Sequence, residues 1–355
     1  MKLYAIILAL MVACFVAFAG CRVHKVDRRD FMQLFANELQ TTGQESLSPE
    51  MKTYYDMTLI DEAEANLVHE QFGQKRPIPA NGGKKIEFRK FASLPKALTP
   101  LTEGVTPPGK SLSVSTIEAT VSQYGDFVTQ SDVLELTAID NTIVEATKIL
   151  GRQAGMTLDT VVRNVLHSGT NVTYCPKVGA DGAETAVTSR ASLDNTCQLT
   201  VKVLQQVVAK LRAQNAPTIN GKYVGIIHPY VAYDLMRDKE WIDAHKYTTP
   251  ENIFNNEIGE IAGIRFVESS EAKIYAGGVF GTLVMGDGAY GVTEVTGGGL
   301  QTIIKQKGSS GTADPLDQRS SVGWKAMRTA ELLIPQYLVR VESKSAAFSA
   351  SAAEN

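Results

Sequence analysis

Residues 84–121 read KKIEFRKFASLPKALTPLTEGVTPPGKSLSVSTIEATV, and this stretch decides the fold. Apolar residues alternate with polar ones over 84–94 and again over 111–121, which is typical of β-strands. Between them lies TPLTEGVTPPG (99–109), whose prolines and glycines indicate a turn. We therefore predict an extended hairpin in which neither face is strongly apolar. Because such a hairpin is marginally stable alone, it needs another surface to lie against.

The strongest helical pattern runs over residues 140–167, where apolar residues recur every three or four positions. Asp140 or Asn141 is expected to cap its first turn, and Gly169 is expected to end it in a left-handed conformation. The same periodicities predict helices over 59–72, 196–214 and 230–238, a buried strand over 223–228, and strands over 258–306 and 321–343. This order of arm, hairpin, long helix, α/β insert and closing strands indicates a mixed α+β fold.

The charge distribution argues against a nucleic-acid-binding protein. The chain carries a net charge of −3, but residues 1–31 hold five basic and two acidic residues, so the remaining residues carry −6. A protein that neutralises phosphates needs clustered lysine and arginine, and no basic run follows Arg29. Two of the four cysteines, Cys175 and Cys197, lie in the body of the chain. They are too few for a disulfide scaffold, so two reduced thiols are the simpler expectation and a single bridge is the alternative.

No group of residues in the sequence assembles an active site. GVTPPGKS (104–111) formally fits the phosphate-loop pattern, but the residues after it alternate like a strand, and its two prolines remove amide donors that a phosphate would need. His228 ends the predicted buried strand and is more readily explained as a turn residue than as a catalytic base. We therefore expect no enzyme activity, no cofactor and no metal site. A chain of this length without site chemistry, but with a projecting hairpin, is expected to function by contact with its own copies.

Five stretches resemble the major capsid proteins of tailed bacteriophages, in the branch typified by the coat protein of coliphage N-four. The similarity covers residues 32–345 in order. It is carried by FGQKRPIPANGGKKIEFRKFASLPKALTPLTEGVTPPGKSLSV (72–114), QYGDFVTQSDVLEL (123–136), HPYVAYDLMRDKEWIDAHKY (228–247), IFNNEIGEIAGIRFVES (253–269) and GTADPLDQRSSVGWKA (311–326).

This resemblance implies the Hong Kong 97-type capsid fold, with an N-terminal arm, an extended loop, a peripheral domain containing a spine helix, and an axial α/β domain. The expected segments are a leader or mis-assigned upstream sequence (1–31), the arm and first helix (32–80), the extended hairpin (81–125), the peripheral domain with spine helix 140–167 (126–195), the axial domain (196–310), the closing peripheral segment (311–345) and a C-terminal tail (346–355).

The resemblance also implies the kind of contact that the chain makes. The hairpin is expected to lie across a neighbouring subunit, so deletion of residues 84–121 is expected to leave a soluble subunit that forms no shells. Trp324 suits a subunit contact as a large amphipathic side chain, although a core position is equally consistent with it. Some shells of this fold are crosslinked between lysine and asparagine, but no constellation in this chain assigns that chemistry. The candidate inter-subunit contacts are Lys90, Glu103, Lys110, Arg319 and Trp324.

The first 21 residues, MKLYAIILALMVACFVAFAGC, are typical of a bacterial lipoprotein leader in which Cys21 receives lipid. Three interpretations compete: translation begins at Met32, the leader is removed during maturation, or the protein is an envelope lipoprotein. We favour the first, because residues from Met32 onward resemble the start of such coat proteins.

The sequence therefore predicts a major capsid protein that assembles into pentamers and hexamers of an icosahedral phage head around double-stranded DNA. Its partners are other copies of itself, together with the scaffold and portal proteins that the resemblance implies; DNA is only enclosed, and no small molecule is expected. It would be found in the virion after assembly in the host cytoplasm. The alternatives are the shell of an encapsulin-type cellular nanocompartment or, if the leader is genuine, an envelope lipoprotein.

Overall fold

The chain divides into two units, Met1–Leu47 and Ser48–Asn355, and the computed structural model describes most of the second. Residues up to 56, including the arm and the candidate lipidation site Cys21, lie outside the described residues. The described ranges are 57–63, 67–79, 81–91, 94–101, 103–106, 109–137, 142–179, 181–248, 259–309 and 314–355.

One 14-residue strand, β15 (Arg319–Leu332), organises a five-stranded sheet. One of its edges pairs antiparallel with β4 (Ser122–Ser131), and the other pairs first with β14 (Gln301–Lys305) and then with β13 (Tyr290–Thr293). β1 (Gln74–Lys75) joins the far side of β13 in parallel. Because successive side chains of a strand point to opposite faces, every second residue of β15 points to the same side of the sheet.

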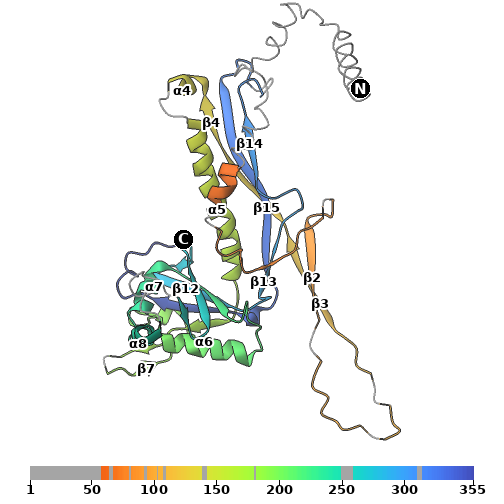
Figure 1. Cartoon of the computed structure of the whole chain (residues 1–355), viewed down its shortest axis with the longest axis vertical. Helices are drawn as coiled ribbons and strands as arrows, with labels where there is room; N and C mark the ends of the chain where they lie inside the picture. The colour runs from red at the N-terminus through yellow and green to blue at the C-terminus, as the bar shows by residue number, and fades with distance from the viewer. Residues whose placement is uncertain are drawn as a thin grey trace, which may run out of the picture. The chain divides into compact units, whose positions relative to one another are not determined.

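Helix α5 (Thr142–Leu166) lies along that side, beside β15 and β4 (Figure 1). The structure confirms the predicted long helix, while the expected capping residues 140 and 141 lie outside the described residues. Apolar residues at helical spacing pack against alternate residues of the strand, as both periodicities require. The set consists of Leu150, Ala154 and Leu158 on α5 and Val322, Trp324 and Ala326 on β15.

The C-terminal end of α5 is held by an arginine and not by a glycine cap. Gly169 does not have a positive φ, so the predicted left-handed cap is wrong. Instead, the guanidinium of Arg340 donates hydrogen bonds to the carbonyl oxygens of His167 and of Gly169, the latter at 3.0 Å. Arg340 is in turn paired with the buried carboxylate of Glu342 at 2.9 Å. A cation at this end also satisfies the carbonyl groups that a helix leaves without partners.

A seven-stranded mixed sheet forms the second part of the unit. Its strand order is β5-β16-β12-β8-β10-β9, with β11 paired to β12. The strands are β5 (Val172–Tyr174), β8 (Tyr223–Ile227), β9 (Glu260–Ile261), β10 (Ile264–Glu268), β11 (Ile274–Tyr275), β12 (Val279–Met285) and β16 (Leu338–Lys344).

Both faces of this sheet are covered, which explains why β8 and β12 are buried at every position. One face packs against α6 (Val201–Ala213), α7 (Pro229–Met236) and α8 (Lys239–Thr248). The opposite face meets the end of α5, in a cluster that contains Val162, Leu166, Val224, Ile226, Leu283 and Met285. The long helix therefore contributes to the core of both sheets.

The predicted helix over 196–214 starts later than expected. Thr200 caps α6, and its hydroxyl accepts a hydrogen bond from the amide of Val203 at 3.5 Å. The residues before it form a turn in which the amide of Thr196 donates to the carboxylate of Asp194 at 3.0 Å. The predicted strand over 223–228 is confirmed for β8, and His228 instead becomes the N-cap of α7.

The predicted helix over 59–72 is only partly correct. Residues 57–63 are helical, whereas residues 69–72 form turns. The short helix crosses α5 at Gly151, where a Cβ atom would lie 2.8 Å from the carbonyl oxygen of Leu59. Leu59 and Ala63 are fully buried at this crossing.

Shorter elements complete the described structure. The predicted hairpin is confirmed as β2 (Lys85–Phe91) paired antiparallel with β3 (Val114–Thr120), with Phe88 opposite Ile117. The remaining elements are α4 (Asp132–Thr137), η1 (Arg190–Ser192), η3 (Pro335–Tyr337) and the small hairpin of β6 (Lys177–Val178) and β7 (Glu184–Thr185).

Strand pairing crosses the segment boundaries that we expected. β13 and β14 lie in the expected axial segment 196–310, yet they pair with β15 of the closing segment. β16 belongs to the closing segment, yet it pairs with β12 and β5 in the seven-stranded sheet. Local patterns cannot show such pairings, because they join residues far apart in the chain. None of the described helices is long and apolar enough to span a membrane.

We predict that Gly151→Ala destabilises the chain, although alanine favours a helix by about 1 kcal/mol over glycine. The added Cβ would press against Leu59 and against the Cβ of Glu62 at 3.0 Å. Overpacking of this kind costs about 1–3 kcal/mol, to be measured by urea unfolding. Asn164→Ala, at an exposed position of the same helix, is the control and should be neutral or stabilising. A stabilised Gly151→Ala variant would contradict the close crossing.

We also predict an acid-sensitive contribution from His228. Its Nδ1 accepts the amide hydrogen of Tyr230 at 3.1 Å, and burial lowers the pKa of its imidazole to about 4 from an ordinary 6.5. Between these values the unfolded chain binds more protons than the folded chain, so stability is lost as pH falls from 6.5 toward 4.

His228→Asn keeps a side-chain acceptor at the N-cap but removes the titration. Between pH 7 and pH 5 the wild-type chain should lose on the order of 2 kcal/mol more stability than this variant. Thermal unfolding across this pH range measures the difference. Parallel profiles for the two chains would refute the assignment.

Candidate assembly surfaces

The hairpin of β2 and β3 has a buried base and an exposed tip. Phe88, Ala119 and Val121 lie at the base, and each is less than one tenth exposed. The ring of Phe88 lies against Gly291 of β13, where a Cβ atom would be 2.9 Å from the ring. The guanidinium of Arg76 lies over the same ring, 5.7 Å from its centroid. The base is therefore anchored within its own chain.

This anchoring corrects the expectation that the hairpin packs only between chains. Deletion of residues 84–121 would remove three buried side chains from the subunit itself, so it would damage the fold as well as assembly. The alternating pattern of 84–94 and 111–121 predicted the strands, but it did not show that one face of the base meets β13.

The tip between the strands holds apolar side chains that nothing in the described chain covers. Leu98 and Leu101 are 82% and 77% exposed, and the other large exposed members are Leu94, Val105 and Leu112. The described residues between Leu94 and Ser113 form no helix or strand. Complete burial of a leucine or valine side chain contributes about 1.5–3 kcal/mol, so this tip gains most if a second surface covers it.

The phosphate-loop pattern GVTPPGKS lies within this tip. The residues that follow it, from Leu112, lead into strand β3 and not into a helix. A phosphate loop needs the first amides of a helix to hold the phosphate, so the structure agrees with the interpretation of this stretch as a hairpin tip.

Three of the candidate contact residues are exposed, and the side chain of a fourth lies outside the description. Glu103 and Lys110 are exposed in the tip, and Arg319 is exposed at the start of β15. Lys90 lies in β2 opposite Ser115, and its side chain is outside the description.

Trp324 is a core residue and is not available as a contact. Its side chain is only 3% exposed, and it packs against α5. The indole N–H donates to the side-chain oxygen of Gln153 at 3.4 Å, so its polar atom also has a partner inside the subunit. The alternation of β15 explains this position, because Trp324 shares a face with Val322 and Ala326.

A second exposed apolar site lies on the face of the five-stranded sheet that is opposite α5. Gly323 of β15 pairs with Phe127 of β4 on one side and Ile303 of β14 on the other. A Cβ at Gly323 would lie 2.6 Å from the Cβ of Phe127, so there is no room for a side chain at this position. Phe127 is 67% exposed and Ile303 is 37% exposed. Sequence reasoning missed this row, because it depends on the pairing of three distant strands.

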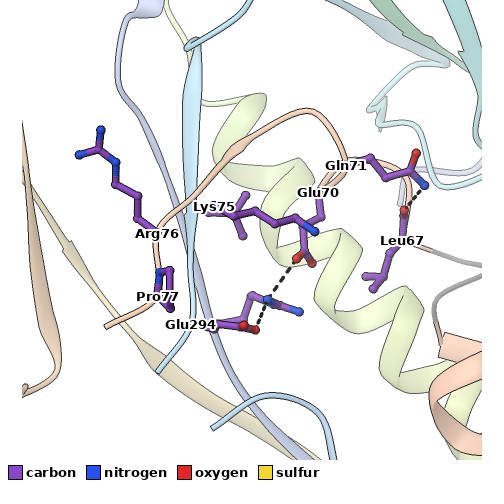
Figure 2. A pocket seen from close by; sticks show the side chains of 9 residues that line it. Leu67, Glu70, Gln71, Lys75, Arg76, Pro77 and Glu294 are labelled. Carbon is purple, nitrogen blue, oxygen red and sulfur yellow. Dashed lines mark hydrogen bonds and ion pairs between the residues drawn. The ribbon is translucent and has the colours of Figure 1, made fainter. Parts of the chain in front are cut away.

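A polar cavity of about 420 Å³ lies where the segment after the first helix meets the sheet (Figure 2). Arg328 lies between two carboxylates, 3.1 Å from Glu70 and 2.7 Å from Glu294. Burial raises the pKa of Glu70, and the charge of Arg328 opposes that shift. Figure 2 shows Arg76 pointing away from these carboxylates. The arrangement has no nucleophile beside a base, so it supports attachment of this segment and not catalysis.

A fully buried contact between His69 and Asp159 holds the same segment to α5. Nδ1 of His69 lies 2.6 Å from a carboxylate oxygen of Asp159, whose other oxygen accepts the amide hydrogens of Val68 and His69 at 2.9 Å and 2.7 Å. The hydroxyl of Tyr290 donates to the carbonyl oxygen of His69. The two ends of the pair are 90 residues apart, so no local motif could have indicated it.

The other residues considered for chemistry also have structural roles. His228 caps α7 and lies beside the ring of Phe280, with 5.1 Å between ring centroids. Cys175 and Cys197 are both free and buried, as the simpler expectation had it, and burial raises the pKa of both thiols. Among the described residues, no group of histidine, cysteine and carboxylate side chains is arranged to hold a metal ion.

Comparison with known proteins agrees with a role in assembly. The family model described as phage capsid protein matches residues 114–341, which is more than half of the chain. The search of curated proteins finds no match.

Solved phage capsids have the same fold, although their sequences differ widely. The capsid of cyanophage P-SCSP1u is 15% identical, with a TM-score of 0.62 over 88% of this chain and 92% of its own. The cyanophage Pam1 capsid is 12% identical, with a TM-score of 0.59 over 88% and 97%. The capsid of Ralstonia phage GP4 is 15% identical, with a TM-score of 0.58 over 87% and 96%.

These structures identify the arrangement of α5, the hairpin and the two sheets as the Hong Kong 97-type capsid fold. The exposed hairpin tip and the match to the family model lead to the same conclusion. The chain belongs to the phage capsid protein family and is the major capsid protein of a phage head, where copies of it associate into the shell of the virion.

Proposed function

We propose that the subunits form closed rings of five and six copies in which each hairpin tip lies on the next subunit. The observation that carries this proposal is the contrast within one hairpin between a buried base and a tip with exposed leucines. The base directs the tip away from its own sheet. The apolar side chains of the tip are therefore exposed and can pack against another chain.

The kind of symmetry follows from the position of the tip. The tip and the surface that receives it are different parts of the subunit, so each contact is head-to-tail. Head-to-tail contacts close into rings when the rotation between subunits allows it. Repetition of the same modest contact in every subunit then stabilises the shell, because each added contact is made between groups that are already held close together.

Other features of the shell belong to the same proposal. The net charge of −6 on residues 32–355 favours a wall that encloses double-stranded DNA without binding it tightly. We also propose that the chain belongs to the branch typified by coliphage N-four and that it assembles in the host cytoplasm with scaffold and portal proteins. We propose that the five-stranded sheet with α5 forms the peripheral domain and that the seven-stranded sheet forms the axial domain, with the strand exchanges described above.

We predict that replacing residues 94–113 by a short Gly-Ser link abolishes shells while the subunit still folds. This change keeps the buried residues Phe88, Ala119 and Val121. The free energy of unfolding should therefore change by less than about 1 kcal/mol, as is usual for surface changes. Electron microscopy and sedimentation would count the particles. Normal particles from this variant would refute the role of the tip.

A pair of point variants tests the same surface without a deletion. Leu98→Asp combined with Leu101→Asp places two charges on the tip and should reduce particle yield at least tenfold, since burying an unpaired charge is costly. Val178→Asp, on β6 of the small hairpin, is the matched control, because it is exposed but lies outside the tip. Particles that enclose protein cargo and no DNA would favour a cellular nanocompartment instead.

A further inference from the structure

The last eleven residues, SAAFSASAAEN (345–355), are mostly alanine and serine, and nearly all of them fall in the expected C-terminal tail. In the structure they follow β16 directly and lie on the seven-stranded sheet, beside α7 and the turn before β12. Ser345 is fully buried and Ser349 is 7% exposed. Side chains of this size and polarity are rarely buried without specific partners.

The two serines fold the start of the tail into a compact turn. The amide of Ser345 donates to the hydroxyl of Ser349 at 2.8 Å, and the amide of Ser349 donates to the carbonyl oxygen of Ser345 at 3.3 Å. The hydroxyl of Ser349 donates to the carbonyl oxygen of Gly278 at 2.8 Å. The turn is thus joined to the loop between β11 and β12.

An aromatic side chain is the second point of attachment. Phe348 stacks on Tyr230 of α7, with 4.3 Å between centroids and 14° between planes. The edge of Tyr233, one helical turn further on, meets the same ring at 5.6 Å. Tyr230 in turn contacts Phe280, which is fully buried, so the stack connects the tail to the core.

The final residue is the third point of attachment. The side-chain oxygen of Asn355 accepts the amide hydrogen of Ile274 at 2.8 Å, and its side-chain nitrogen donates to the carbonyl oxygen of Ala272 at 3.2 Å. Lys273 donates to the backbone oxygen of Asn355. A side-chain amide that both donates to and accepts from neighbouring backbone groups recognises its partner in one orientation only.

The receiving surface is shaped for this tail at one glycine. Gly278 has a φ of +68°, and a Cβ atom there would collide with the carbonyl oxygen of Ser349. The neighbouring Gly277 has a φ of +79°, yet a Cβ there would meet nothing within 4 Å. A residue other than glycine would have a strained backbone at either position. Only at Gly278 would its Cβ also collide with the tail.

We propose that α7 and the segment Ala272–Gly278 form a peptide-binding groove whose ligand is the C-terminal segment 345–355 of the capsid chain, bound here by the same subunit. The ligand is defined by a serine turn, one aromatic ring and one carboxamide, held at three points along eleven residues. The groove is a property of the subunit and does not depend on how the hairpin tips pack.

Gly278→Ala and Gly277→Ala are a matched pair for testing the groove in the full chain, compared in the same assembly state as checked by sedimentation. Both introduce alanine at a positive φ, so their difference isolates contact with the tail. We expect Gly278→Ala to lower Tm by roughly 4–8 °C more than Gly277→Ala. The reason is that only the Cβ at position 278 is pressed against the tail, and such overpacking is destabilising. Amide hydrogen exchange of residues 345–355 should rise only in Gly278→Ala. Equal shifts and unchanged exchange would overturn the proposal.

A chain that ends at Lys344 tests whether the tail acts as a ligand. We expect its Tm to fall, and we expect the synthetic peptide SAAFSASAAEN at millimolar concentration to restore at least half of the loss. The same peptide with alanine in place of phenylalanine should restore none. If the shortened chain keeps the wild-type Tm, or if both peptides act alike, the groove does not bind this segment. If the shortened chain does not fold, the glycine pair still decides the question.

Discussion

The packing of α5 against two different sheets is the constraint on which the rest of the structure depends. Its middle turns bury apolar residues against β15, and its last turns bury Val162 and Leu166 against the seven-stranded sheet. The helix can serve both sheets only if its position relative to them is fixed. Arg340 fixes the C-terminal end through the last carbonyl groups, and the pairing of His69 with Asp159 ties the preceding segment to the middle of the helix.

Burial of Asp159 on this helix and of Glu342 on β16 is tolerated because each carboxylate has partners. Asp159 accepts three hydrogen bonds, and Glu342 is paired with both Arg190 and Arg340. Breaking one member of such a pair costs several kcal/mol, because the remaining charge is buried without compensation. These contacts join segments that are distant in the chain, so they make the whole unit depend on a single correct arrangement.

The hairpin separates folding from assembly. Its base contributes Phe88 to the subunit, while its tip contributes leucines that stay exposed until another chain covers them. A subunit built in this way completes its own core at the base of the hairpin and keeps apolar side chains exposed at the tip. The row of Phe127, Gly323 and Ile303 on the open face of the five-stranded sheet shows that exposed apolar surface is not limited to the tip.

Sequence patterns identified the elements whose signals are local. The long helix, the hairpin strands and β8 follow from hydrophobic periodicity, and the phosphate-loop pattern could be rejected because a strand follows it. Predictions failed where a distant partner overrides the local signal. The helix over 59–72 ends early where the chain turns to bring His69 to Asp159, and Gly169 needs no left-handed cap where Arg340 is present.

The sequence by itself determined the class of fold, the family and the presence of a hairpin with a tip unable to bury itself. Only the tertiary structure decided which side chains remain available for contact. It placed Trp324 in the core, anchored Phe88 against Gly291, exchanged β13, β14 and β16 between the expected segments, and bound the C-terminal residues to α7. The physical reason is that periodicity reports which face of an element is apolar, whereas the identity of the surface that covers it depends on contacts between residues far apart in the chain.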